Sequence, residues 1–226
     1  MARGPLAFAG DTMVADVVVR ALDEAGLGCP PSSTVLDFGC SSGRVARAIR
    51  AFRPDLTLLG CDPNTAAVAW AAAHLPGIRF FESAVSPPLP LAAASVDRAY
   101  AISIWSHFAA TPALAWLDEM HRIVKPGGGL MITTHGLDTV AHQLRGRLMS
   151  DESASETTAA LLHDGYHFRS IFGEAGDWGI TDPGWGEAYA GADWLAAHVT
   201  PRWSIRLFRR AMLQRNQDVL VLERQP

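Results

Sequence analysis

An apolar run, a glycine-bearing turn and an amphipathic run follow one another without interruption over residues 35–52. The first run is apolar apart from Asp37 and predicts a buried strand, and the second predicts a helix that Pro54 stops. Gly39 allows a sharp bend, and Gly43 allows either a ligand or the sheet to approach the start of the helix. Free backbone N–H groups at a helix start attract an anionic group such as a carboxylate. This segment therefore predicts a site that can hold a nucleotide-like cofactor.

The same alternation of strand and helix continues along the chain. Strand patterns occupy residues 34–38, 56–61, 78–81, 98–104 and 130–134, and helical patterns occupy 13–25, 44–52, 64–74 and 112–123. Successive strands joined through helices imply crossover connections, and hence a parallel sheet with helices on both faces. Two further strand-like runs lie at 203–208 and 218–223, so the sequence predicts an α/β fold.

The composition fits one globular domain, with 226 residues, 49% of them hydrophobic and 19% charged. A net charge of −4 gives no basic field for nucleic acid or an anionic membrane surface, and no apolar run is long enough to span a bilayer. Cys29, Cys40 and Cys61 form no CxxC pair, which disfavours a disulfide framework and a zinc site. We therefore expect a cytoplasmic protein without a bound metal, acting on neither nucleic acid nor membranes.

The stretch from 151 to 193 differs from the rest of the chain. It holds nine acidic residues against one basic residue, Arg169, together with seven glycines. Two interpretations are open: a solvated loop surface, or an acidic mouth over a binding site. In the second case, Asp177, Asp182 and Glu187 would favour a cationic ligand.

A second acidic residue ends the second predicted strand. Asp62 stands 25 residues after Asp37, where a carboxylate can accept hydrogen bonds from both hydroxyls of a ribose, although a helix cap or a turn is the alternative. The glycine turn is not the dinucleotide fingerprint GxGxxG, because Ser41 and Arg44 stand where that motif needs glycine. A nicotinamide-dependent oxidoreductase is therefore a distant alternative.

Four segments resemble the successive motifs of class I S-adenosylmethionine-dependent methyltransferases: VLDFGCSSGRVAR, LLGCDPN, VDRAYAISIWSHF and EMHRIVKPGGGLMITTHG, which span residues 35–136. The resemblance implies a Rossmann-like three-layer sandwich whose seven-stranded, mostly parallel sheet has an antiparallel last strand. It also implies a single domain over 1–226, with an N-terminal helical segment at 1–33 and an insert or cap at 136–200 that builds the acceptor pocket.

The resemblance also implies the cofactor, S-adenosylmethionine, and its contacts. The glycine loop would wrap the methionine part, the acid after the second strand would bind the ribose, and later segments would contact the adenine and support the methionine part. The residues at these positions are Asp37, Gly39, Cys40, Ser41, Gly43, Asp62, Pro63, Asn64, Ala84, Val85, Ile102 and Ser103. Ser41 departs from the family, which usually has glycine there, and we expect a modest cost.

Methyl transfer from a sulfonium is an in-line displacement that gains from holding donor and acceptor in line. If the acceptor is a phenol, an alcohol or an ammonium, a proton must also leave, which suits a histidine. His107 and His135 follow the fourth and fifth predicted strands, at the edge where ligands bind, although either could be a packing residue. His163 and His167 lie in the acidic stretch and could reach the site from above.

The acceptor class follows by exclusion. The chain after the fourth strand carries neither the acidic or Asn-Pro-Pro-aromatic motif of nucleic-acid amino methyltransferases nor the Pro-Cys nucleophile of cytosine C5 enzymes. We predict methyl transfer to an oxygen or nitrogen of a small-molecule metabolite, with a non-catalytic S-adenosylmethionine-binding protein as the alternative. Trp178, Trp185 and Trp194 either close over that acceptor or anchor a glycine-rich loop.

Overall fold

The computed structural model describes residues 5–226. Its strands are β1 (Thr34–Phe38), β2 (Thr57–Asp62), β3 (Ile78–Glu82), β4 (Val96–Ala101), β5 (Val124–Thr134), β6 (Tyr166–Arg169), β7 (Glu187–Ala190), β8 (Trp203–Leu213) and β9 (Gln217–Arg224). Its helices are α1 (Pro5–Glu24), α2 (Arg44–Phe52), α3 (Thr65–His74), α4 (Ala110–Ile123), α5 (Leu137–Arg145), α6 (Asp151–His163), α7 (Ala192–Val199) and the short η1 (Gly173–Ala175).

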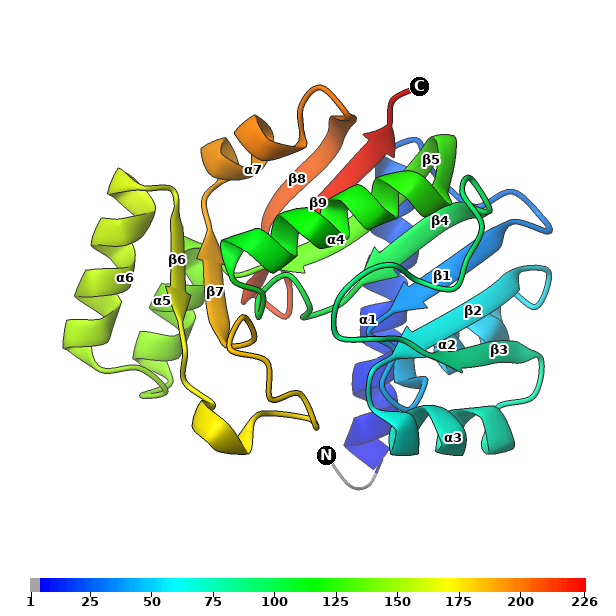
Figure 1. Cartoon of the computed structure of the whole chain (residues 1–226), viewed down its shortest axis with the longest axis horizontal. Helices are drawn as coiled ribbons and strands as arrows, with labels where there is room; N and C mark the ends of the chain where they lie inside the picture. Colours follow the sequence, from blue (N-terminus) through cyan, green and yellow to red (C-terminus); the bar gives the residue numbers. More distant parts are fainter. Residues whose placement is uncertain (1–4) are drawn as a thin grey trace.

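Seven strands form one sheet in the order β3–β2–β1–β4–β5–β9–β8 (Figure 1). β1 to β5 pair in parallel, whereas β9 runs antiparallel to both β5 and β8. The predicted fold class, including the antiparallel last strand, is confirmed. Of the predicted N-terminal segment 1–33, residues 1–4 lie outside the described residues, and α1 begins earlier than the helix predicted at 13–25.

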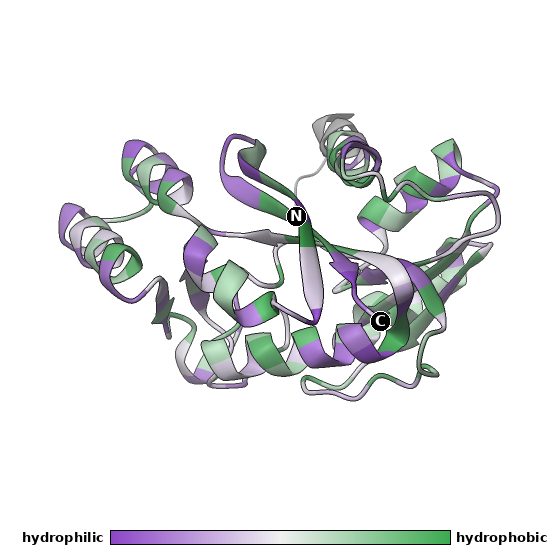
Figure 2. Cartoon of the chain, turned by 90° about the horizontal axis from the view of Figure 1, so that it is seen from above, coloured by the Kyte–Doolittle hydropathy of each residue, from purple (hydrophilic) through white to green (hydrophobic). Residues whose placement is uncertain are grey.

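Helices cover both faces of the sheet (Figure 2). The central strands are apolar on both sides because each side has its own core: Leu36 packs with the cluster under α4 and α7, and its neighbour Val35 packs with the cluster under α1 and α2. Trp116 and Met120 anchor α4 in the first cluster, and both are almost fully buried. The result is the predicted sandwich of three layers.

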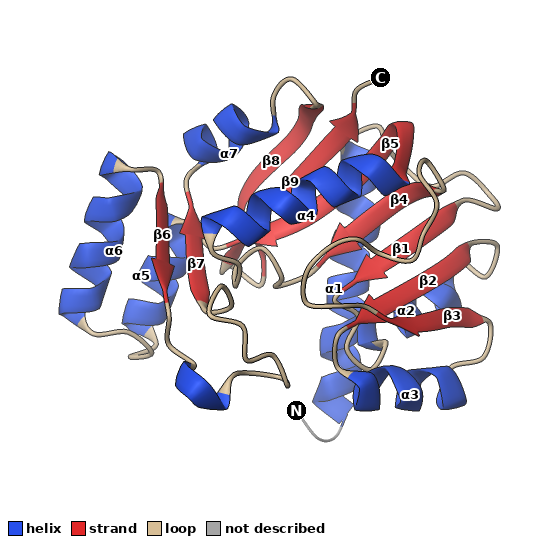
Figure 3. Cartoon of the chain, in the orientation of Figure 1, coloured by secondary structure: helices blue, strands red, loops and turns tan. Residues whose placement is uncertain are grey.

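Between β5 and β8 the chain builds the insert, residues 136–200, which comprises α5, α6, the β6–β7 hairpin, η1 and α7 (Figure 3). Residues 151–193 are not a loop throughout, because they contain α6, β6, η1 and β7, but most of their acidic side chains are exposed, as the interpretation as a solvated surface expects. The two helices were missed because they bury few large apolar side chains: α5 buries Thr139 and Val140, and α6 buries Ala154, Thr157 and Leu161.

The fourth strand is shorter than predicted. It ends at Ala101 rather than at Ile104, because the chain leaves the extended conformation and Ser103 adopts a left-handed φ of 58°. Residues 102–104 form a half-buried turn that lines a cavity rather than a longer strand.

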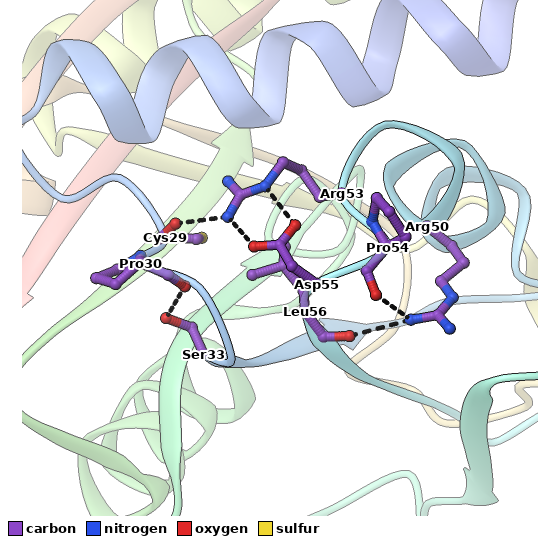
Figure 4. A network of polar contacts seen from close by, with 8 residues as sticks. All are labelled: Cys29, Pro30, Ser33, Arg50, Arg53, Pro54, Asp55 and Leu56. Atoms are coloured by element: carbon purple, nitrogen blue, oxygen red, sulfur yellow. Dashed lines mark hydrogen bonds and ion pairs between the residues drawn. The ribbon is translucent and has the colours of Figure 1, made fainter.

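Two arginines fasten the loops at the amino edge of the sheet (Figure 4). Arg53 donates to Asp55 through Nε and Nη2 at 2.9 and 2.6 Å, and Nη2 also donates to the carbonyl of Cys29 at 2.8 Å. Arg50 donates to the carbonyl of Leu56 at 3.2 Å. The acceptors include backbone carbonyls of the loops that precede β1 and β2. The two arginine side chains therefore hold these loops in place at the amino edge of the sheet.

Two absences apply to the described residues, 5–226. No helix there is both long and apolar enough to cross a membrane. No group of three or more His, Cys, Asp or Glu side chains is placed to hold a metal ion.

Candidate active site

A cavity of about 300 Å³ opens at the carboxyl edge of the parallel strands. Its walls come from the loops after β1, β2, β3 and β4, from the start of α4, and from residues 178–185 of the insert. Ligands of open α/β sheets bind at this edge, and the volume lies within the roughly 300–1,000 Å³ range of ligand pockets.

Asp62 ends β2 and lines the cavity. Oδ2 accepts from the backbone N–H of Ser41 at 2.7 Å, and Oδ1 accepts from that of Asn64 at 2.8 Å. These two bonds fix the carboxylate, and each oxygen keeps a lone pair that can accept from a ligand hydroxyl. Burial raises the pKa of Asp62 above its ordinary value. The alternative role, capping the next helix, belongs to Asn64, whose side chain accepts from the backbone N–H of Ala67 at 3.0 Å.

The glycine loop lies against the turn that follows β4. Gly39 has a φ of 78°, and a side chain there would place a Cβ only 2.2 Å from Cδ1 of Ile104. Ser41 also lies in the left-handed region, with a φ of 49°. That conformation is the physical reason why glycine suits this position, because a Cβ in it crowds the following carbonyl oxygen.

Gly43 serves the packing of the fold rather than the ligand. It caps α2 with a φ of 74°, and a Cβ would lie 2.7 Å from Cδ1 of Leu75 and 2.8 Å from Cζ of Phe80. Of the two roles predicted for this glycine, the structure supports the close approach to the sheet. Gly43 does not line the cavity.

Two other predicted cofactor residues also lie behind the cavity wall. Asp37 and Cys40 are buried and do not line it. Burial raises the pKa of Asp37 to about 7, with a smaller contribution in the same direction from the charge of Asp62. Burial also raises the pKa of the Cys40 thiol. The other predicted cofactor residues do line the cavity: Gly39, Ser41, Asp62, Pro63, Asn64, Ala84, Val85, Ile102 and Ser103.

His107 is the predicted base that reaches the cavity. Its Nδ1 lies 2.7 Å from the carbonyl oxygen of Gly186, and because a carbonyl only accepts, Nδ1 carries the proton. Nε2 therefore holds the free lone pair. The ring stacks on Trp185 with centroids 4.7 Å apart. Burial lowers the pKa of His107, so the imidazole is neutral near pH 7 and able to take a proton.

His135 lies deeper and does not line the cavity. Burial lowers its pKa to about 3. Its Nε2 lies 3.3 Å from Nε2 of Gln217, whose amide also donates to Oγ of Ser103 at 2.9 Å. This polar chain supports the turn after β4 from below.

The two histidines of the insert do not line the cavity either. His163 is exposed and pairs with Asp164 at 2.6 Å, and His167 lies on β6.

The three tryptophans of the insert divide between the two predicted roles. Trp178 and Trp185 line the cavity, and the carbonyl of Trp178 accepts from Nδ2 of Asn64 at 3.0 Å, which ties the insert to the loop after β2. Trp194 lies outside the cavity and stacks on His198 and Tyr166, with centroids 4.1 and 4.3 Å apart. It anchors the insert.

Several cavity residues were not predicted from the sequence: Phe38, Arg44, Ser83, Ser86, Ile104, Phe108, Pro112, Trp116, Ile180 and Gly184. Arg44 had a signal, because it is the first residue of the helix that follows the glycine loop. The side chain of Trp116 had none, since an apolar position on an amphipathic helix does not reveal that the cavity reaches it.

The chain is similar to known methyltransferases in part of its sequence and in its fold. A family model described as "Methyltransferase domain" matches residues 35–128. A SAM-dependent methyltransferase structure from Methanosarcina mazei superposes with a TM-score of 0.62 at 18% identity, covering 87% of this chain and 94% of that one, and so shows the same fold. Residues 35–128 therefore match a methyltransferase domain, and the chain as a whole shares the fold of this S-adenosylmethionine-dependent methyltransferase.

Two curated relatives are similar over part of their length. A trans-aconitate 2-methyltransferase from Acidovorax sp. (strain JS42) is 28% identical over 141 residues, which cover 59% of this chain and 53% of the relative. A malonyl-[acyl-carrier protein] O-methyltransferase from Hahella chejuensis is 26% identical over 147 residues, covering 59% of this chain and 50% of the relative. The matches span about half the length of these relatives.

Proposed function

We propose that this protein transfers a methyl group from S-adenosylmethionine to an oxygen or nitrogen atom of a small-molecule acceptor. The observation that carries the proposal is one cavity that is lined both by Asp62, whose carboxylate is fixed by backbone N–H groups, and by His107, whose Nε2 keeps a free lone pair. The small-molecule acceptor named for the Acidovorax relative and the O-methyl transfer named for the Hahella relative favour this acceptor class.

The lining residues fit the cofactor. Asp62 offers two oxygens that each have a lone pair for a ribose hydroxyl, while Pro63, Asn64 and Ala84 offer a mostly apolar wall beside it. Arg44, at the start of α2 beside the glycine loop, supplies a positive charge for a carboxylate. When bound, S-adenosylmethionine supplies an electrophilic methyl group on a sulfonium.

The chain's own groups then account for the transfer. Residues of the insert and of the turn after β4 hold the acceptor in line with the donor. His107 takes the acceptor proton at Nε2, while its Nδ1–H keeps the ring oriented on Gly186. We assign the base to His107 rather than His135, because His135 has no access to the cavity and its pKa of about 3 makes it a poor proton acceptor.

We further propose that residues 136–200 form a cap on a single domain and that this cap completes the acceptor pocket. Residues 178–185 on the cavity wall support this assignment. The three cysteines are free, which is consistent with the expected cytoplasmic setting.

Calorimetric titration with S-adenosylmethionine and S-adenosylhomocysteine tests the cofactor assignment. Asp62→Ala is expected to weaken binding at least tenfold, about 1.4 kcal/mol. Asp164→Ala, an exposed acid outside the cavity, is the matched control and leaves affinity unchanged. Absence of binding by the folded wild-type protein would refute the proposal.

Turnover separates the proposed enzyme from the non-catalytic alternative. With an active acceptor, His107→Gln is expected to lower kcat about 100-fold, a typical contribution of a general base, while affinity for S-adenosylhomocysteine is retained. A protein that retains S-adenosylmethionine but never forms S-adenosylhomocysteine would favour the binding protein.

A further inference from the structure

The cavity lining that comes from the start of α4, from the residue stretch just before it and from the insert is apolar and aromatic. We call it the acceptor wall, and it consists of Phe108, Pro112, Trp116, Ile180 and Trp185. Phe108 and Trp185 meet edge to face with centroids 5.5 Å apart, and Phe108 stacks on Trp116 at 6.4 Å. Their rings are held by packing, so the wall has a fixed shape.

Positive charge is missing from the acceptor wall. Among the described residues, Arg44 is the one basic side chain that lines the cavity, and it comes from the cofactor side, next to the glycine loop. Its Nη1 lies 3.1 Å from Oδ1 of the buried Asp11, which holds it at the start of α2. A carboxylate on the acceptor would therefore be buried against the wall without a partner, which is costly.

The acidic side chains of the insert also contribute no buried negative charge to the acceptor wall. Glu187 pairs with Arg169 at 3.2 Å and accepts from Gln143 at 2.6 Å, and neither Glu187 nor Asp177 lines the cavity. Asp182 does line it, but it is exposed at the rim, where Oδ1 accepts from the backbone N–H of Gly184 at 2.7 Å. A cationic acceptor thus has one exposed carboxylate and no buried partner on the wall.

We infer that the acceptor is an uncharged, planar aromatic molecule that carries a hydroxyl group, and that this hydroxyl is methylated. The inference rests on the proposed function and narrows its acceptor class. Flat aromatic ligands gain from offset or edge contacts with aromatic side chains, which Phe108 and Trp185 offer. The imidazole of His107 is the polar group beside them, and its free Nε2 accepts from the hydroxyl.

A phenol-type hydroxyl matches the chemistry that His107 provides. The acceptor oxygen forms a bond to the methyl carbon while the carbon–sulfur bond breaks and its electron pair stays on sulfur, giving a neutral thioether. The hydroxyl proton passes to Nε2 of His107 and leaves to solvent once the product departs. A carboxylate is already deprotonated at neutral pH and would need a cation rather than a base.

The experiment uses matched sets of acceptors on one-, two- and three-ring aromatic skeletons, each with a hydroxyl, a carboxylate or an aminomethyl group. Each compound is titrated into the full chain saturated with S-adenosylhomocysteine, and methyl transfer is followed by mass spectrometry in the presence of S-adenosylmethionine. On at least one skeleton, the hydroxyl compound is expected to bind at least tenfold more tightly than its charged counterparts and to be the one methylated. Preference for a charged member, or binding of none, would overturn the inference.

Variants of two tryptophans locate the binding surface. Trp185→Leu is expected to weaken binding of the hydroxyl compound at least tenfold, and Trp185→Phe to retain most of it. Trp70→Leu, which removes an exposed ring on α3 outside the cavity, leaves it unchanged. Equal effects of Trp185→Leu and Trp70→Leu would contradict the acceptor wall.

Titration of the same preparations with S-adenosylhomocysteine distinguishes failure of the proposed function from failure of the inferred acceptor class. If the wild-type protein does not bind it, the proposed function fails. If it binds but the aromatic hydroxyl compounds are not preferred, only the acceptor class fails. Retained affinity in both leucine variants shows that they are folded.

Discussion

Nδ1 of His107 and the backbone oxygen of Gly186 lie 2.7 Å apart, although 79 residues separate them in the chain. Backbone hydrogen bonds of 2.8 Å at three positions join residues 106–109 to 184–188 around this contact. The ring orientation of the proposed base is thus set by a backbone carbonyl of the insert.

The pH profile of kcat/KM tests the state of His107. Burial lowers the pKa of this imidazole, so the rate should rise with pH and reach its plateau with an apparent midpoint below 6.5. The charges of Asp177 and Glu187 act in the opposite direction on the pKa. Glu187→Gln removes one of them and is expected to move the midpoint to still lower pH. A midpoint that rises in this variant would contradict the assignment.

Ser41→Gly tests the strain in the cofactor loop. Serine at a φ of 49° costs roughly 1–2 kcal/mol, while glycine costs about 0.5–1 kcal/mol in chain entropy. The free energy of unfolding is therefore expected to rise by about 0.5–1 kcal/mol, measured by denaturant titration. Ser42→Gly is the control, because Ser42 lies outside the left-handed region and should lose stability.

Gly43 and Gly127 separate steric crowding from backbone strain. Both have a positive φ, 74° and 71°, but a Cβ at Gly43 meets Leu75 and Phe80, whereas a Cβ at Gly127 meets nothing within 4 Å. Gly127→Ala should cost about 1 kcal/mol, and Gly43→Ala about 2–4 kcal/mol. Thermal unfolding of both variants gives the comparison. Equal costs would show that packing of α2 on β3 tolerates the methyl group.

Asp37 makes folding stability depend on pH. Its pKa is about 7 in the folded protein and near 3.8 when unfolded, so between these values the folded state holds a proton that the unfolded state releases. Stability therefore falls as pH rises through this window, by roughly 4 kcal/mol at about 1.4 kcal/mol per pH unit.

Asp37→Asn removes this titration. The free energy of unfolding of the variant minus that of the wild-type protein should be more favourable at pH 8 than at pH 4. Denaturant unfolding of both proteins at both pH values measures this difference. A pH dependence that survives unchanged in the variant would assign it to another group.

Asn64 has two separable roles, since its Oδ1 caps α3 and its Nδ2 donates to the carbonyl of Trp178. Asn64→Asp keeps the acceptor but loses the donor, so residues 176–180 should exchange their amide hydrogens faster while α3 stays intact. Asn64→Ala loses both and should cost about 1 kcal/mol in addition. If residues 176–180 exchange at the same rate in the wild-type protein and in Asn64→Asp, the hydrogen bond from Asn64 to Trp178 does not stabilise this loop.

The parts of the site that the sequence revealed are those set by neighbouring residues. Asp62 could be placed because a strand-end acid beside a glycine loop has a local signature, and its bond to Ser41 joins two adjacent strands of a parallel sheet. Gly39 was predictable for the same reason, as a sharp bend between a strand and a helix.

The insert was not predictable in this way. α5 and α6 bury few large apolar side chains, and α6 leaves no strong apolar period in the sequence. The contact of His107 with Gly186, and the meeting of Trp116 with the cavity, depend on how distant segments pack. Ser103 is an example of the opposite error. Its apolar neighbours in the sequence predicted a strand, whereas the chain turns at this residue.

The place of β9 between β5 and β8 has a consequence for biosynthesis. β5 ends at Thr134 and its antiparallel partner begins at Gln217, so the insert and β8 are translated before β5 gains its second neighbour. At roughly 5–20 residues per second, that interval lasts on the order of 4–16 s. During it, one edge of an apolar strand remains open to pairing with other chains, a liability that ends when β9 inserts.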